Sequence, residues 1–141
     1  METVKAEMKK VYCDTLLELA KTDDRIVIIN SDSRNITGTA PFEAAYPDRS
    51  FNVGIAEANM VGVAAGLSVS GKRPFVHAFG PFMTRRVLDQ MTISLAYSGL
   101  NAVLVGVSPG IIAEVNGGTH QGYEDIGVIR PVANSTIVEA F

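Results

Sequence analysis

The protein has 141 residues, 47% hydrophobic and 19% charged, which is typical of one globular domain. The formal net charge of −3 and the scattered basic residues exclude the electrostatic signature of a nucleic-acid-binding protein. The apolar runs are too short for a membrane span and the charged N-terminus does not resemble a secretory signal, so we expect a cytoplasmic protein without membrane partners.

The first third of the chain predicts a helix, a strand and a loop. Apolar residues at helical spacing indicate a helix over residues 3–21, with Cys13 as a small core residue. Residues 26–29 form a continuous β-branched run, which suits a strand buried on both faces of a parallel sheet. Residues 30–48 are polar, contain Gly38, Pro41 and Pro47, and are predicted to be mostly loop.

The rest of the chain alternates between strands and helices. Strands are predicted over residues 51–53, 74–79 and 101–107. Helices are predicted over residues 56–70, ending at Gly71, over 84–97 and, as a short element, over 123–129. A long glycine-rich loop should cover residues 108–122, and a last strand residues 136–140.

This alternation predicts an α/β fold, a three-layer sandwich with a mostly parallel sheet between helices. Ligands of such sheets bind beyond the carboxyl ends of the strands, where polar residues collect in this sequence. They include Asn30, Ser31 and Asp32 after the first strand and Glu57 after the second. Because the last strand has no helix to cover it, we expect a single domain over residues 1–141 that is cut short or needs partners.

Several common kinds of site are disfavoured. The sequence has neither standard glycine-rich phosphate loop. His77 and His120 lie far apart and Cys13 is the single cysteine, so no zinc cluster and no metal ligands are predicted. Hydrolase and metalloprotein functions are therefore weakly supported.

Glu57 lies in the first turn of an otherwise apolar, small-residue helix. It could simply be a favourable anion near a helix N-terminus. Alternatively, it could be a partly desolvated carboxylate that shares a proton with a ligand nitrogen. Gly62, Ala65 and Gly66 make one flank of this helix small, which suits internal helix packing and a subunit interface equally.

A family resemblance favours the second interpretation of Glu57. The sequence FNVGIAEANMVGVAAG at residues 51–66 resembles the hallmark of the transketolase pyrimidine-binding domain. The resemblance continues through PFVHAFGPF at 74–82 and DQ at 89–90, and resumes at GGTHQ, 117–121, and ED, 124–125. These motifs stand in the family's order and cover most of the chain after residue 26.

The resemblance implies a role for each of five residues. Glu57 matches the glutamate that hydrogen-bonds the pyrimidine nitrogen of thiamine diphosphate, which favours the imino form of the neighbouring amine and so helps deprotonate the reacting carbon. Phe79 and Phe82 match aromatic residues that pack on the pyrimidine ring. His120 matches a histidine near the reacting part of the substrate, and Asp32 resembles an acidic residue close to the cofactor. Glu57 and His120 are the implied catalytic residues.

Three positions depart from the family pattern. Arg85 stands where many transketolases have a third aromatic residue of the pyrimidine pocket. Asn116 replaces an aspartate that contacts sugar hydroxyls, and Ser108 replaces a histidine that helps bind the sugar phosphate. These departures put the usual sugar-phosphate specificity in question.

The resemblance also implies a function and partners. We expect part of a transketolase-type transferase that moves a two-carbon ketol unit between sugars, resembling the C-terminal section of split transketolases. A separate diphosphate-binding subunit would hold Mg²⁺, so the chain alone should be inactive, and the small-residue helix suggests a homodimer. The alternatives are another thiamine-diphosphate enzyme, such as deoxyxylulose-phosphate synthase or a 2-oxoacid dehydrogenase beta subunit, and a non-catalytic dimerisation or regulatory module.

Overall fold

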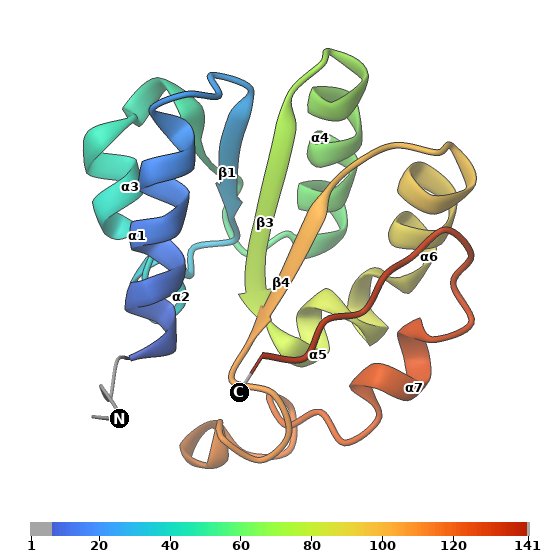
Figure 1. The fold of residues 1–141 in the computed structure, drawn as a ribbon. Helices are drawn as coiled ribbons and strands as arrows, with labels where there is room; N and C mark the ends of the chain where they lie inside the picture. Colours follow the sequence, from blue (N-terminus) through green and yellow to red (C-terminus); the bar gives the residue numbers. More distant parts are fainter. Residues whose placement is uncertain (1–6, 141) are drawn as a thin grey trace, which may run out of the picture.

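Four parallel strands form the centre of the computed structural model, which describes residues 7–140 (Figure 1). The strand order is β2-β1-β3-β4, with β1 spanning Ile26–Asn30, β2 Ser50–Asn52, β3 Arg73–Phe79 and β4 Val103–Val107. Every neighbouring pair is parallel, so all four strands end at one edge of the sheet. The predicted α/β fold with a parallel sheet is confirmed.

Helices cover both faces of this sheet. Helices α1 (Met8–Ala20) and α3 (Ala40–Ala45) lie on one side, and α4 (Glu57–Val69) and α6 (Leu88–Gln90) on the other (Figure 1). The shorter helices are α2 (Arg34–Thr37), α5 (Gly80–Met83) and α7 (Asp125–Ile129). The predicted three-layer arrangement follows from this placement. Part of the predicted first helix, residues 3–6, lies outside the described residues.

The sheet separates two hydrophobic clusters, because neighbouring side chains of a strand point to opposite faces. Ile28 lies opposite Phe75 in the register, and both pack in the cluster under α1 and α3. Ile29 lies opposite Val76, and both pack in the cluster under α4. Cys13 is 2% exposed within the first cluster, as expected for a core residue.

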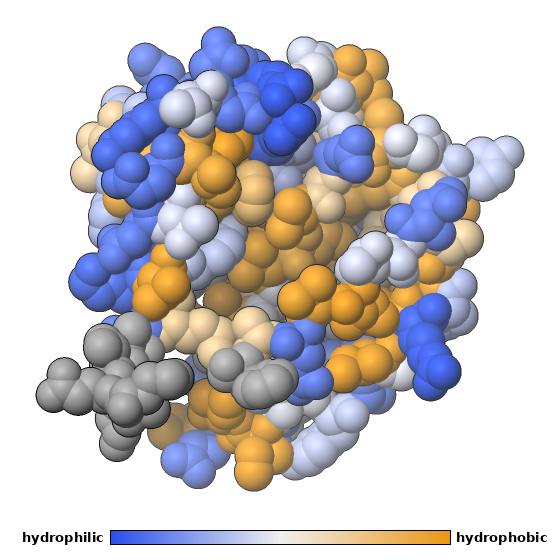
Figure 2. Space-filling model, viewed as in Figure 1, coloured by the Kyte–Doolittle hydropathy of each residue, from blue (hydrophilic) through white to orange (hydrophobic). Residues whose placement is uncertain are grey.

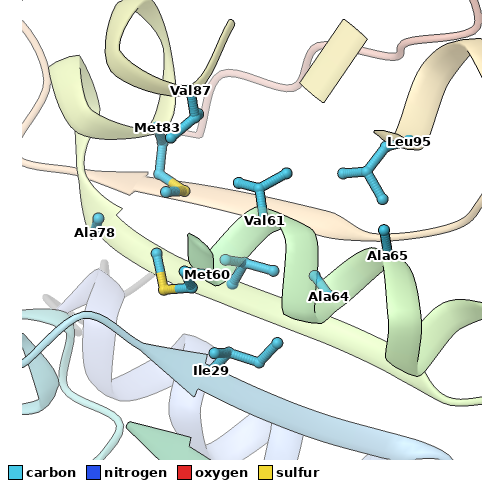
Figure 3. Close-up of a cluster of buried hydrophobic side chains, with 10 residues drawn as sticks. Ile29, Met60, Val61, Ala64, Ala65, Ala78, Met83, Val87 and Leu95 are labelled. Carbon is cyan, nitrogen blue, oxygen red and sulfur yellow. The ribbon is translucent and has the colours of Figure 1, made fainter. Parts of the chain in front are cut away.

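Helix α4 supplies the centre of the second cluster (Figure 3). Met60, Val61 and Ala64 are fully buried against the sheet. The helix ends just before Gly71, as predicted, and the φ of +83° at Gly71 lies in the left-handed region. The Gly71 N–H donates to the Ser68 carbonyl at 3.0 Å, and the Lys72 N–H donates to the Leu67 carbonyl at 2.9 Å, which satisfies two of the last carbonyls of the helix.

The prediction of a loop over residues 30–48 is wrong, because the segment contains α2, α3 and a 3₁₀ turn at Pro47–Arg49. Pro41 and Pro47 do not break helices here. Each lies in the first turn of a helical element, where the missing N–H of proline costs nothing. Phe42 on α3 is fully buried and explains why the segment folds against α1.

The predicted helix over residues 84–97 is divided. A 3₁₀ turn at Arg85–Val87 leads into α6, and residues Met91–Tyr97 form a π-helical segment. The buried residues Val87, Met91 and Leu95 repeat every four positions, which exceeds the 3.6-residue period of an α-helix. A π-helix has more residues per turn than an α-helix, so it keeps side chains at this spacing facing the core. This gives a physical reason for the π-helical segment.

The predicted strand over residues 136–140 is wrong: this segment is irregular in the described structure and pairs with no strand there. Its Thr-Ile-Val sequence has strand propensity, but propensity cannot replace a hydrogen-bonding neighbour. The predicted loop over 108–122 is confirmed apart from a 3₁₀ turn at Glu114–Asn116, and the short helix near its end is α7.

Strand β4 is an edge strand, and apolar side chains gather beside it in Figure 2. Val103 is 45% exposed there, since α1 and α3 cover the other end of the sheet. Within residues 7–140, no helix is long and apolar enough to cross a membrane.

Candidate functional site

Four of the site residues named by the sequence lie at or beside the carboxyl edge of the sheet. Ser31 and Asp32 directly follow β1, Phe79 ends β3, and Glu57 begins α4 shortly after β2. This edge is where parallel α/β sheets bind their ligands. Among residues 7–140, no group of three or more His, Cys, Asp or Glu side chains could hold a metal ion.

Glu57 is buried, with 4% of its surface exposed, although it is the first residue of α4. Its Oε2 atom accepts a hydrogen bond from Arg86 Nη1 at 2.9 Å. Its Oε1 atom accepts a longer hydrogen bond from Ser31 Oγ at 3.4 Å. Glu57 is thus not a solvated helix-terminal anion but a buried carboxylate held by groups from two other segments.

Phe79, Phe82 and His120 form an aromatic cluster at the same edge. The two phenylalanine centroids lie 5.8 Å apart, because α5 begins directly after β3 and brings Phe82 back beside Phe79. The His120 ring centroid lies 4.9 Å from each phenylalanine centroid, edge to face. The structure therefore brings together three residues that lie on two separate stretches of the sequence.

The loop that carries His120 is fixed to the segment after α5. Arg85 donates to Glu124 Oε1 at 2.6 Å and to the Thr119 carbonyl at 3.4 Å, and its hydrogen bond lowers the pKa of Glu124. Arg85 therefore faces this loop and does not take the place of a ring in the aromatic cluster. Thr119 Oγ1 lies 2.9 Å from His120 Nδ1 and orients the imidazole.

A second contact fixes the same loop. Thr84 Oγ1 donates to Asp125 Oδ1 at 2.7 Å, and the buried Oδ2 atom has no hydrogen-bond partner in the described structure. Asp125 lies so close to Gly80 that a Cβ atom there would come within 2.9 Å of Oδ2. The absence of a side chain at Gly80 thus leaves room for the Asp125 carboxylate beside α5.

The hydrogen bonds of Asp32 in the described structure are with Asn52 and not with Glu57. The Asp32 N–H donates to Asn52 Oδ1 at 3.0 Å, and Asn52 Nδ2 donates to Asp32 Oδ1 at 3.4 Å, which joins the ends of β1 and β2. Asp32 has a φ of +58°, and Ser108, after β4, has a φ of +51°. These left-handed residues follow two of the strand ends, where strained backbone often accompanies function.

Arg86 is the site residue that the sequence interpretation missed. Its guanidinium carbon lies 3.6 Å from the Phe82 ring centroid while Nη1 contacts Glu57. The predicted regular helix over 84–97 gave no reason to distinguish Arg86 from Arg85. An adjacent pair of arginines beside the aromatic motif was the one available signal.

Fold and site together define an α/β domain whose ligand-binding edge carries a buried carboxylate beside aromatic rings. The family model for the transketolase pyrimidine-binding domain matches residues 4–140, and the chain belongs to this family.

Two curated relatives illustrate the range of the family. The chain is 48% identical over 132 residues to the 6-deoxy-6-sulfo-D-fructose transketolase subunit SqwH of Clostridium sp. (strain MSTE9), covering 94% of this chain and 41% of the relative. It is 40% identical to the 1-deoxy-D-xylulose-5-phosphate synthase of Desulforudis audaxviator, covering 89% of this chain and 19% of that enzyme. The chain thus spans less than half the length of these relatives.

A solved structure of a split-gene transketolase, in the form of an inactive beta4 tetramer, is 36% identical to this chain, with a TM-score of 0.76. The similarity covers 89% of this chain and 40% of the solved one.

Proposed function

We propose that this chain is the pyrimidine-binding part of a thiamine-diphosphate-dependent transketolase that transfers a two-carbon ketol unit between sugars. One observation carries the proposal. A buried carboxylate and the face of an aromatic ring lie close enough for the single planar group of Arg86 to contact both, at 2.9 Å and 3.6 Å. An aminopyrimidine is likewise planar and needs an acid at its ring nitrogen.

The residues present therefore fit the pyrimidine half of the cofactor. Glu57 would hold the ring nitrogen, Phe79 and Phe82 would pack on the ring, and Asp32 would lie at the rim. When bound, the cofactor supplies a carbon nucleophile, which no amino-acid side chain provides. The family's dependence on thiamine diphosphate supports this assignment.

Each side chain has a proposed task. Glu57 holds a proton at the ring nitrogen, and its burial excludes water that would compete for this hydrogen bond. Phe79 and Phe82 fix the plane of the ring. His120 would hydrogen-bond a substrate oxygen near the reacting carbon, and the contacts of Arg85 and Thr84 with its loop support this task.

The proposed assembly has two kinds of subunit. A separate diphosphate-binding transketolase subunit would hold the diphosphate and its Mg²⁺, and the isolated chain would be inactive. Two copies of this chain would pair through α4, and we assign the assembled enzyme to the cytoplasm. The name of the relative SqwH, a transketolase subunit, supports a partner subunit.

The proposed substrates are ketose and aldose sugars, including sugar phosphates. Asn116 lies exposed on the loop before His120, and Ser108 follows β4 at the ligand-binding edge. Neither side chain supplies the carboxylate or imidazole expected at these positions. A donor other than the common sugar phosphates, such as the sulfonated ketose in the name of SqwH, is consistent with both departures.

Reconstitution of the full-length protein with its diphosphate-binding partner tests the proposal. We expect ketol transfer that requires thiamine diphosphate, and a loss of about a hundredfold or more in kcat for Glu57→Gln, since a positioned proton donor contributes about this much. Donors to screen include ketose phosphates, 6-deoxy-6-sulfo-D-fructose and pyruvate.

Two outcomes would favour the other candidates. Turnover of pyruvate without turnover of any ketose would favour another thiamine-diphosphate enzyme, either a deoxyxylulose-phosphate synthase, to which the chain has a 40% identical relative, or a 2-oxoacid dehydrogenase. Full activity of the Glu57→Ala complex would instead indicate a non-catalytic dimerisation or regulatory module.

A further inference from the structure

Arg86 contacts both surfaces that the proposed function gives to the pyrimidine ring. Its Nη1 atom donates to Glu57 Oε2 at 2.9 Å, and its guanidinium lies over the Phe82 ring with its carbon 3.6 Å from the centroid. A guanidinium is flat, carries several N–H donors and stacks on aromatic faces. It therefore offers Glu57 and Phe82 the same kinds of contact as a flat nitrogen heterocycle.

The contact has a clear physical cause. Glu57 is 4% exposed, and a buried carboxylate without a charged or hydrogen-bonding partner is strongly destabilising. Ser31 supplies only a long hydrogen bond of 3.4 Å to the other oxygen. Arg86 is thus the main compensation for the buried charge in the ligand-free domain.

The same contact can be released. The Arg86 side chain is 43% exposed and lies on a short 3₁₀ turn. Because the side chain is long and flexible, its guanidinium can rotate away from Glu57 into solvent without a change of the backbone. The neighbouring Arg85 is engaged elsewhere, with Glu124 and the Thr119 carbonyl, and does not contact Glu57.

We propose that Arg86 is an internal occupant of the pyrimidine site, which neutralises Glu57 until the cofactor displaces it. This inference rests on the proposed function and adds a gating step to it. Only domains with Arg86 released can bind the cofactor ring, so the apparent affinity equals the intrinsic affinity multiplied by the fraction of domains in which Arg86 is released. Arg86 is a regulatory residue of the site and takes no part in the reaction.

The test uses thiamine diphosphate binding to the reconstituted two-subunit complex, followed by intrinsic fluorescence in stopped flow and by calorimetry. Arg86→Ala should lower the dissociation constant roughly three- to tenfold, mainly through faster association. This is the range expected for loss of an ion pair with one partly exposed and one buried partner. Arg86→Lys keeps the charge but cannot lie flat on Phe82, and should fall between the wild type and Arg86→Ala.

A double-mutant cycle with Glu57 gives a sharper readout. In a Glu57→Gln background the ion pair is already lost, so adding Arg86→Ala should leave the association rate within about twofold. Arg73→Ala is the matched control, because Arg73 pairs with Asp23 at the opposite end of β3, and it should bind like the wild type. Thermal unfolding of each complex checks that the variants fold, and Arg86→Lys retains a counter-ion for Glu57 in any case.

Equal or weaker binding by both Arg86 variants would overturn the inference, as would a cofactor-bound structure in which Arg86 still contacts Glu57. Failure of the proposed function itself would look different. In that case the wild-type complex would bind no thiamine diphosphate, or Glu57→Gln would remain fully active.

Discussion

At the scale of single residues, His77 is a buried ionisable group that the proposed chemistry does not use. It is fully buried on β3, and its Nδ1 lies 3.2 Å from the Ile29 carbonyl. A carbonyl can only accept, so Nδ1 carries the proton and Nε2 accepts from the Tyr12 hydroxyl at 2.8 Å. Burial lowers the pKa of His77 from 6.5 to about 4, although the Ile29 hydrogen bond opposes this shift.

This lowered pKa predicts a pH-dependent stability. Between about pH 6.5 and pH 4 the unfolded chain binds a proton at His77 that the folded protein does not, so unfolding becomes easier as the pH falls. The contribution of neutral, buried His77 to the free energy of unfolding is fully present above pH 6.5 and is lost as the pH falls towards 4. It should amount to about 3 kcal/mol at most.

Urea unfolding at several pH values between about 4 and 7 measures this slope. His77→Gln should flatten the slope in this window, even if it lowers stability at neutral pH by leaving Tyr12 or Ile29 without a partner. A slope that is unchanged in His77→Gln would show that other groups cause the pH dependence.

At the scale of elements, the end of α4 depends on backbone conformation alone. An added Cβ at Gly71 meets no atom within 4 Å, yet its φ of +83° is costly for any other residue. Gly71→Ala should therefore lower the free energy of unfolding by about 1 kcal/mol.

Gly127 provides the matched comparison. It lies inside α7, also has open space around an added Cβ, and has no left-handed φ. Gly127→Ala should stabilise the protein by up to about 1 kcal/mol, because alanine has the higher helix propensity. Denaturant unfolding of both variants tests the opposite signs, and a destabilised Gly127→Ala would contradict the explanation.

Some of the helices and strands could be predicted from the sequence alone, and others could not. Strand β1 was predictable from its buried β-branched run, β4 from its valine-rich sequence, and α4 from its small apolar residues. The failures have local causes. Pro41 lies in the first turn of a helix, although proline in a polar segment predicts a loop. The four-residue spacing of Val87, Met91 and Leu95 is close enough to the α-helical period to predict a regular helix.

The candidate site was predictable in part. The sequence named Glu57, Phe79, Phe82 and His120, and the structure gathers the last three into one cluster. Arg86 was not predictable, because its contact with Glu57 depends on the 3₁₀ turn that interrupts the expected helix. The residue roles themselves stay predictions.

At the scale of the whole molecule, two of the three small residues on the flank of α4, Gly62 and Gly66, face outward, whereas Ala65 is buried in the cluster under the helix. An added Cβ at Gly62 or Gly66 would meet no atom within 4 Å, so internal packing does not explain these glycines. Ile55 and Val69, at either end of the helix, are 79% and 72% exposed. These exposed glycines therefore favour a subunit interface, where a second subunit can approach α4 closely.

We therefore expect the protein to be a homodimer and Gly62→Glu to shift it to monomers, because a charged side chain would be buried at the contact. Thr15→Glu adds the same charge on the exposed side of α1, across the sheet, and should leave the dimer intact. Size-exclusion chromatography with light scattering measures both. A wild-type monomer at working concentration would rule out this use of α4.

The separation of the core by the sheet has a consequence for how sequence changes act. Ile28 and Ile29 are neighbours in the chain but belong to different hydrophobic clusters, as do Phe75 and Val76. In each central strand, alternate residues therefore pack in different clusters, one on the α1 side of the sheet and one on the α4 side. A substitution in the cluster under α1 can be compensated by other residues of that cluster, without changing the packing of α4, which carries Glu57. The residues on the two faces of the sheet can therefore diverge in sequence at different rates.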